Sequence, residues 1–435
     1  MTGLAGRRLA SVFYGWWIVV AGFVIQLLNG ALLFHAFSAY ILPLQAEFGW
    51  NRTQVSGAFA MARAESGILG PIQGWFIDRY GPRRIMRAGN VLFAVGFLLL
   101  SRVTGIYSFY GAFAIIAVGS SLGGFMPITA AMTSWFSRWR STALGLMLAG
   151  MGVGGLLVPG VVWFLGEYGW RTSAQLSAVL MLVLGLPATQ VMRKRPEHVR
   201  PDGDPASSHP ARAPGPAPAA TSPAAAALAP QLEPEVSYTA RQAIATPSFW
   251  LLALVHGCAL LIVGTVLTHQ IPHMVEGIGL SPERAASVVA ALVMITLVGQ
   301  LAGGLLGDRL NKRLVIFGAM WLHAVAMVVF ACATTVVGAL AFTVLHGAAW
   351  GVRGTLINAI RADYFGSRYY ATITGWNSLM VMIGMTAGPL FSGVIRDVTG
   401  DYRSAFLALA AIAVVASVAS VLARPPGPPP VAELV

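Results

Sequence analysis

The sequence is poor in charged residues and in cysteine. Charged side chains make up 10% of its 435 residues, whereas a soluble domain carries about 25%. Hydrophobic residues make up 56%, which excludes a soluble globular enzyme and a disordered chain. The net charge is +12, but the sequence contains no polar domain on whose surface the basic residues could form a patch. Nucleic acid is therefore not an expected partner. The composition therefore predicts a membrane protein in contact with the lipid bilayer.

Two cysteines, Cys258 and Cys332, are too few for a disulfide framework. Both lie in apolar stretches, where we expect small buried side chains. The sequence contains no zinc-ligand spacing and no Walker motif of the form G-x-x-x-x-G-K-[ST]. We therefore expect no metal, no other cofactor and no step driven by ATP.

Long apolar runs predict the fold, because a membrane-spanning helix needs about 20 apolar residues. The expected spans are 13–42, 53–77, 85–102, 106–133, 141–165, 172–192, 248–275, 284–306, 314–333, 336–361, 369–395 and 403–423. The first run is too long for the core of a signal peptide, so we interpret it as a retained helix. We predict an all-α polytopic membrane protein with twelve transmembrane helices arranged as two six-helix bundles. We expect it to be a monomer in the cell membrane.

A segment rich in proline and alanine separates the two sets of runs. Residues 196–235 hold ten of the chain's 25 prolines, and such a composition cannot bury a core. We predict an N-terminal bundle over 1–195, a disordered cytoplasmic linker over 196–246, and a C-terminal bundle with a short tail over 247–435. Most of the 28 basic residues fall in segments on the same side of the membrane as the linker. By the positive-inside rule, both termini are expected to be cytoplasmic.

The two halves match at a shift of about 230 residues. Gly74 and Asp78-Arg79 align with Gly304 and Asp308-Arg309, and Arg83 aligns with Arg313. Such a repeat predicts two parallel bundles related by an axis along the membrane normal. Transporters with this architecture move one half against the other around a site near the middle of the membrane.

The repeated motif resembles the loop 2–3 signature of the major facilitator superfamily. Its pattern here is Gly74-x3-Asp78-Arg79-x-Gly81-x-Arg83-Arg84, and the stretch from Trp135 to Gly145 resembles the fifth-helix signature of the monocarboxylate transporter and oxalate/formate antiporter branch. The resemblance implies that Asp78 holds the start of the eleventh span when the site faces outward. The expected gating residues are Gly74, Asp78, Arg79, Gly81, Arg83, Arg84, Asp308, Arg309 and Arg313. The alternative is that these charges only set the topology.

Three ionisable residues lie inside the expected spans. They are Arg63, Glu65 and Arg353, and each costs about 2.5–3.5 kcal/mol near the membrane centre, so such residues usually face a cavity. The resemblance places Arg353 on one of the four helices that line the central cavity, where its guanidinium would bind a carboxylate through two hydrogen bonds. Arg63 is the second candidate. The alternative is a structural ion pair between one of the arginines and Glu65.

Further candidates come from the helices that the resemblance assigns to the cavity wall. For substrate binding these are His35, Asn29, Trp376, Asn377 and His269. The binding residues of the named branch, an arginine in helix 8 and a lysine in helix 11, have no counterpart here. If a proton is coupled to transport, Glu65 is the first candidate carrier and His35 the second, because histidine titrates near physiological pH. A facilitator without coupling is the alternative.

These features favour a secondary active transporter, a symporter or antiporter, for a small organic anion such as a carboxylate. One alternative is efflux of amphipathic drug-like compounds by the same fold. That function would suit a cavity lined by Trp16, Trp17, Phe34, Phe37, Trp350 and Trp376. A remote alternative is a membrane receptor or enzyme without transport. It would need a folded soluble domain, which the linker cannot form.

Overall fold

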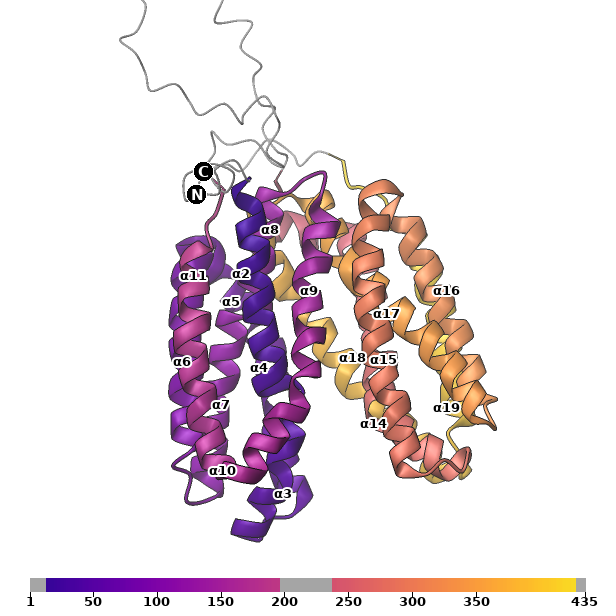
Figure 1. The fold of residues 1–435 in the computed structure, drawn as a ribbon. Helices are drawn as coiled ribbons and strands as arrows, with labels where there is room; N and C mark the ends of the chain where they lie inside the picture. The colour runs from indigo at the N-terminus through magenta and orange to yellow at the C-terminus, as the bar shows by residue number, and fades with distance from the viewer. Residues whose placement is uncertain (1–12, 196–236, 428–435) are drawn as a thin grey trace, which may run out of the picture.

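The described part of the chain forms two helical bundles that lie side by side (Figure 1). The structure is a computed structural model that describes residues 13–195 and 237–427. All regular secondary structure within these ranges is helical. Figure 1 shows the first bundle in indigo to magenta and the second in orange to yellow.

The helices of both bundles follow the expected apolar runs. The first bundle contains α2 (Tyr14–Asn29), η1 (Gly30–Phe34), α3 (Phe37–Phe48), α4 (Arg52–Ile68), α5 (Gly70–Tyr80), α6 (Pro82–Leu100), α7 (Ile106–Gly123), α8 (Phe125–Trp135), α9 (Arg140–Leu156), α10 (Val158–Leu180), η2 (Met181–Gly185) and α11 (Leu186–Val191). The second contains α13 (Ala240–Ile244), α14 (Pro247–Pro272), η5 (His273–Gly277), α15 (Pro282–Arg309), α16 (Lys312–Ala331), α17 (Val336–Phe365), α18 (Tyr370–Thr399) and α19 (Arg403–Leu422).

Several expected spans of the first bundle are interrupted helices. The range 53–77 divides at Leu69 into α4 and α5, with Pro71 in the first turn of α5. The range 106–133 divides at Gly124. Proline lacks an N–H and glycine has no side chain, so both residues favour such breaks. Within α10, Gly169 has a φ of 81° and forms the turn that joins two of the expected spans.

Nine segments of the described residues are long and apolar enough to cross a membrane. One of them, Arg140–Val191, has 52 residues and contains the turn at Gly169. The broken range 53–77 is not among the nine. Twelve crossings and cytoplasmic termini therefore stay predictions.

Two expectations about particular segments change. Residues 196–236 of the expected linker lie outside the described residues, but 237–246 belong to the second bundle. There, α13 is capped by Thr239, and the main-chain N–H of Tyr238 donates to the carbonyl of Phe365 at 3.0 Å. The expectation of two buried cysteines is wrong, because Cys332, directly after the end of α16, is exposed and Cys258 is half-buried.

The two bundles touch at the end of the molecule that carries the start of α2 and the ends of α5, α15 and α17 (Figure 1, top). We call this the predicted cytoplasmic end. A Cβ atom on Gly74 of α5 would lie 2.3 Å from the carbonyl oxygen of Ala371 in α18, and one on Gly145 of α9 would lie 2.5 Å from that of Gln300 in α15. Glycine lets helix backbones approach this closely in a membrane. These contacts close the space between the bundles at one end.

Candidate substrate-binding site

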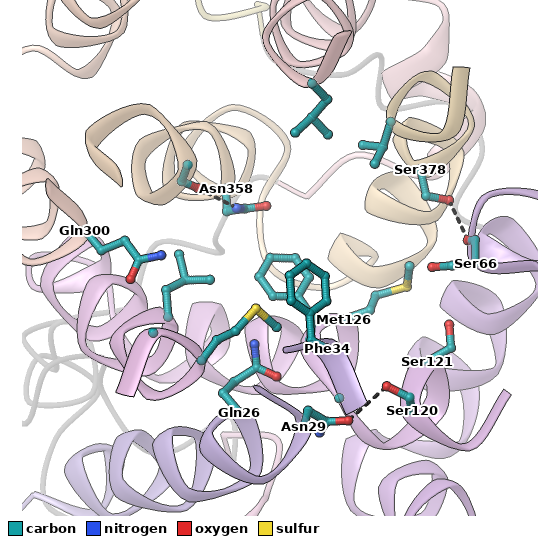
Figure 2. A pocket seen from close by; sticks show the side chains of 18 of the residues that line it. Gln26, Asn29, Phe34, Ser66, Ser120, Ser121, Met126, Gln300, Asn358 and Ser378 are labelled. Atoms are coloured by element: carbon teal, nitrogen blue, oxygen red, sulfur yellow. Dashed lines mark hydrogen bonds between the residues drawn. The ribbon is translucent and has the colours of Figure 1, made fainter. Parts of the chain in front are cut away.

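A cavity of about 450 Å³ lies between the two bundles. Its first wall comes from α2, η1, α4, α7, α8 and α9, and its second from α14, α15, α17 and α18. Polar side chains from both bundles line it, as Figure 2 shows for Gln26, Asn29 and Ser121 on one side and Gln300 and Asn358 on the other. A cavity of this size suits a small molecule.

Arg353 is a buried cation of the second wall. Its side chain lines the cavity and is only 1% exposed. Its Nε and Nη1 atoms are buried and have no hydrogen-bond partner among the residues that the structure describes. Glu65, the carboxylate expected in the alternative ion pair, instead accepts a hydrogen bond from Gln73 at 2.7 Å. A buried guanidinium without a counterion is costly, so this geometry favours an anionic ligand.

A second buried arginine lies eight residues further along α17. Arg361 is 2% exposed and lines the same cavity. Its guanidinium donates to the amide oxygen of Asn358 at 3.3 Å and to Nδ1 of His256 at 3.2 Å. The amide of Asn377 reaches the same Nδ1 at 3.0 Å. Because a guanidinium can only donate, Nδ1 of His256 must accept, and this imidazole carries its proton on Nε2.

Arg361 and His256 were not predicted from the sequence as residues of the site. Arg361 is the last residue of an expected span. A basic residue at that position indicates which side of the membrane the following loop lies on, and not a binding site. The helix continues to Phe365, so Arg361 lies about one turn inside its end. The eight residues from Arg353 to Arg361 correspond to two full turns and a further rotation of about 80° around the helix axis. This spacing was the signal that could have identified Arg361.

The first wall contains a chain of polar contacts that ends at Glu65. The hydroxyl of Ser121 donates to the amide oxygen of Gln73 at 2.7 Å, and the Gln73 amide donates to Oε1 of Glu65. Oε2 of Glu65 is buried without a partner among the described residues. Beside this chain, Asn29 accepts a hydrogen bond from Ser120 at 2.9 Å. These groups come from α2, α4, α5 and α7, so only the packed bundle brings them together.

Of the other predicted substrate-binding residues, His35 and Asn377 also line the cavity, whereas His269 and Trp376 do not. The ring nitrogens of His269 contact the hydroxyl of Tyr402 at 3.2 Å and the carbonyl of Pro389 at 2.9 Å, so its polar groups are already bonded elsewhere. Trp376 is 43% exposed because it points away from the cavity. The side chain of Arg63 lies outside the described residues.

The expected aromatic wall is mostly absent. Of the six aromatic residues named for it, Phe34 and Trp350 line the cavity. Trp17 is 40% exposed, and the ring of Trp16 packs against Phe136 at 5.2 Å. Apolar periodicity alone did not reveal which face of each helix meets the cavity.

Two aspartates tie the bundles together at the predicted cytoplasmic end. The carboxylate of Asp78 accepts hydrogen bonds from the main-chain N–H groups of Ala371 and Thr372, at 3.3 and 2.7 Å, in the first turn of α18. Asp308 forms the matching pair of bonds with the first turn of α9, at 2.8 and 2.9 Å. Each carboxylate therefore satisfies free N–H groups and the positive end of a helix in the opposite bundle.

A third acidic residue at this end was not predicted. Asp363 of α17 pairs with Arg140 of the other bundle, and its second oxygen lies 2.7 Å from Nζ of Lys312. Its side chain is 29% exposed, so solvent screens this pair only in part. Asp363 adds an ion pair between the bundles to the two aspartate caps.

The remaining motif residues lie within their own bundles. Nε of Arg83 donates to the carbonyl of Met192 at 3.0 Å, and Arg313 donates to that of Val421 at 3.5 Å. Gly81 has a φ of 83°, which permits the tight turn between α5 and α6. The exposed motif residues are Arg79, Arg84 and Arg309. Among residues 13–195 and 237–427, no cluster of three or more His, Cys, Asp or Glu side chains could hold a metal.

Comparison with known proteins agrees with this architecture. The sequence profile of the Major Facilitator Superfamily matches residues 22–270 and 249–434. Monocarboxylate transporter 13 of Bos taurus is 24% identical over 92% of this chain and 86% of its own, and human monocarboxylate transporter 11 is 27% identical over 91% and 79%. The Escherichia coli fucose:proton symporter has the same fold, with a TM-score of 0.69 at 15% identity over 95% of this chain and 99% of its own.

These similarities establish the kind of protein. Its relatives are transporters and not enzymes, and the profile together with the apolar helices makes it a multi-pass membrane protein. Within its family it resembles the monocarboxylate transporters. The chain belongs to the Major Facilitator Superfamily.

Proposed function

We propose that this transporter carries a small organic anion whose carboxylate binds Arg353. The observation that carries the proposal is the buried guanidinium, whose Nε and Nη1 lack partners among the described residues while the side chain lines the cavity. Arginine presents a planar fork of donors that matches a carboxylate, and the two hydrogen bonds also fix its orientation. An anion would neutralise a charge that the fold otherwise leaves uncompensated.

The other polar groups of the second wall support the same substrate class. Arg361 adds a second buried positive charge, and His256, held with Nδ1 as an acceptor, adds a neutral ring beside it. Asn377 lies in the same network. The described lining of the cavity contains two arginines, Arg353 and Arg361, and one carboxylate, Glu65. The balance of charge favours an anion over a cation.

Transport would proceed by alternating access. The aspartate caps at Asp78 and Asp308 and the ion pair of Asp363 with Arg140 would break when the predicted cytoplasmic end opens. Each joins the two bundles and would therefore act as part of a gate. The closed helix contacts at Gly74 would separate in the same movement. Arg79, Arg84 and Arg309 would act in this gate only through their charge.

Proton coupling would use Glu65 first and His35 second. Glu65 has one oxygen bonded to Gln73 and one buried oxygen without a described partner, so a proton on Oε2 would remove an unsatisfied charge. His35 lines the same cavity beside Gly155. Asn29 and Arg63, on α2 and α4, complete the proposed binding residues of the first bundle. We place the protein in the cell membrane as a monomer.

Efflux of amphipathic compounds has less support, because Phe34 and Trp350 are the members of the expected aromatic set that line the cavity. The two hypotheses differ in their dependence on Arg353. An anion site requires its guanidinium, whereas a binding site for amphipathic compounds would keep its ligands without it.

Thermal-shift measurements on the purified protein test the proposal. Propionate, benzoate and succinate are compared with the uncharged propionamide and benzamide, each with the native protein, Arg353→Lys and the control Arg102→Lys. Arg102 is exposed just after the end of α6 and does not line the cavity. We expect at least one carboxylate, and neither amide, to raise Tm in the native protein and in Arg102→Lys. The same increase in Arg353→Lys would contradict the assignment.

A further inference from the structure

Two histidines form a buried pair in the second bundle. His323 of α16 and His346 of α17 are both 0% exposed, and their Nδ1 atoms lie 3.2 Å apart. Neither side chain lines the cavity. A hydrogen bond at this distance requires one Nδ1 to carry a proton and the other to offer its lone pair. The two rings are therefore opposite tautomers.

The outer nitrogens of this pair are unsatisfied. Both Nε2 atoms are buried without a hydrogen-bond partner among the described residues. The tautomers leave one of them an N–H donor and the other a free lone pair. Leaving a buried polar group without a partner is unfavourable, so two apolar side chains would pack here at lower cost. The free lone pair can accept a proton without breaking the Nδ1 hydrogen bond, which gives an imidazolium bonded to a neutral imidazole.

The pair is connected to the cavity through α17. His346 precedes Arg353 by seven residues, which is about two turns and places both on the same side of the helix. Trp350 lies between them, with its ring 6.1 Å from that of His346, and it lines the cavity. The stripe His346, Trp350 and Arg353 thus leads from the buried pair to the proposed anion site.

Along α17, Arg353 is the charged residue nearest in sequence to His346. Of the helices packed against α16 and α17, α9, α15, α18 and α19 carry charged side chains only in their first and last turns, α8 carries none, and α14 carries His256 and His269. The remaining titratable groups of α17, which are Arg361, Asp363 and Tyr364, lie in its last two turns. A bare guanidinium at Arg353 therefore opposes a proton on the pair, and an anion bound to it removes that repulsion.

We propose that the His323–His346 pair is a proton-binding site whose occupancy is linked to anion binding at Arg353. The proton comes from solvent, forms an N–H bond at the free Nε2, and leaves when the anion leaves. By reciprocity, each ligand raises the affinity for the other by the same factor. The inference rests on the proposed function, because it requires an anion at Arg353. It adds a coupling site in the second bundle, distinct from Glu65 in the first.

Proton uptake on anion binding tests the proposal. Propionate, benzoate and succinate are titrated into weakly buffered protein with a pH indicator, and their affinities are measured by calorimetry from pH 5.5 to 8. In the native protein we expect uptake of up to one proton per anion. We also expect an affinity that rises by up to about tenfold for each unit of decrease in pH. The double variant His323→Asn and His346→Asn can keep an amide hydrogen bond but binds no proton, so both effects should disappear.

Two further variants separate the outcomes. His269→Gln is the control, because that histidine forms its contacts outside the cavity, and it should behave as the native protein does. Proton uptake that survives in the double histidine variant, or that only Glu65→Gln abolishes, would overturn the inference while leaving the anion site intact. Absence of binding by all three carboxylates would overturn the proposed function as well.

A measurement on the native protein covers the case in which the double variant does not fold. Nitrogen-15 NMR of histidine-labelled protein distinguishes imidazolium from the neutral tautomers. Addition of the carboxylate should convert one neutral histidine signal to imidazolium. The imidazolium signal is assigned to the pair if it is lost in the single variant His346→Asn. An unchanged histidine spectrum at saturating carboxylate would contradict the proposal.

Discussion

Replacing Gly74 with alanine should act as a wedge between the two bundles. The added Cβ would lie 2.3 Å from the carbonyl oxygen of Ala371, and 2.6 and 2.7 Å from the next nearest atoms, all in the backbone at the start of α18. No side-chain rotation can relieve these contacts. Reaching an ordinary contact of 3.4 Å needs a shift of about 1 Å (3.4 − 2.3 Å). That shift would also stretch the hydrogen bonds that Asp78 accepts from the same turn.

The expected cost follows from this geometry. Overpacking of a close contact costs about 1–3 kcal/mol. A cost of about 2 kcal/mol to the closed arrangement changes the ratio of closed to open molecules about 30-fold. Alanine also favours a helix over glycine by up to about 1 kcal/mol. Gly318→Ala in α16 has the same helix effect but adds a Cβ with nothing within 4 Å, so it is the matched control.

Spin labels at Tyr80 and Leu314 would measure the separation of the bundles. Both positions are exposed at the predicted cytoplasmic end, one in each bundle, and the two native cysteines would first be replaced by serine. Gly74→Ala should shift the distance distribution toward longer distances, whereas Gly318→Ala should leave it unchanged. Equal distributions in the two variants would refute the reasoning that this contact closes the gate.

Three further predictions concern other groups. Asp308→Asn should weaken the cap on the first turn of α9 by about 1 kcal/mol, since it removes the carboxylate charge. The spin labels at Tyr80 and Leu314 should then report more open molecules, and an unchanged distance distribution would contradict a gating role. Glu65→Gln should make uptake into proteoliposomes less dependent on pH, and an unaltered pH profile would exclude Glu65 as the proton carrier. Deletion of residues 205–230 should leave uptake intact, and loss of uptake with normal membrane insertion would refute a simple tether.

The repeated motif allowed part of the proposed gate to be predicted from the sequence. Asp78 and Asp308 were identified because the same spacing occurs twice, and both lie at contacts between the bundles. Asp363 occurs in neither copy of the motif. Its role depends on Arg140 and Lys312, which are distant in sequence and meet it only in the folded protein.

The candidate binding site was less predictable, because it depends on the rotation of each helix. Arg353 was identifiable from the cost of a charge inside a span. Trp376 and Asn377 are neighbours in α18, yet Asn377 lines the cavity and Trp376 is exposed. The hydrophobic pattern does not separate them, since an apolar residue can face either lipid or a neighbouring helix in a membrane protein. Arg361 was missed because the span end was placed too early.

Uptake of a carboxylate into proteoliposomes tests the central claim most directly. The substrate would be whichever of propionate, benzoate and succinate stabilises the native protein, and uptake would be compared between the native protein, Arg353→Lys and Arg102→Lys. Loss of a two-point hydrogen bond to a charged group costs about 1.5–3 kcal/mol, so Arg353→Lys should reduce uptake at least about tenfold while Arg102→Lys does not. Equal uptake by all three proteins would contradict an anion site at Arg353.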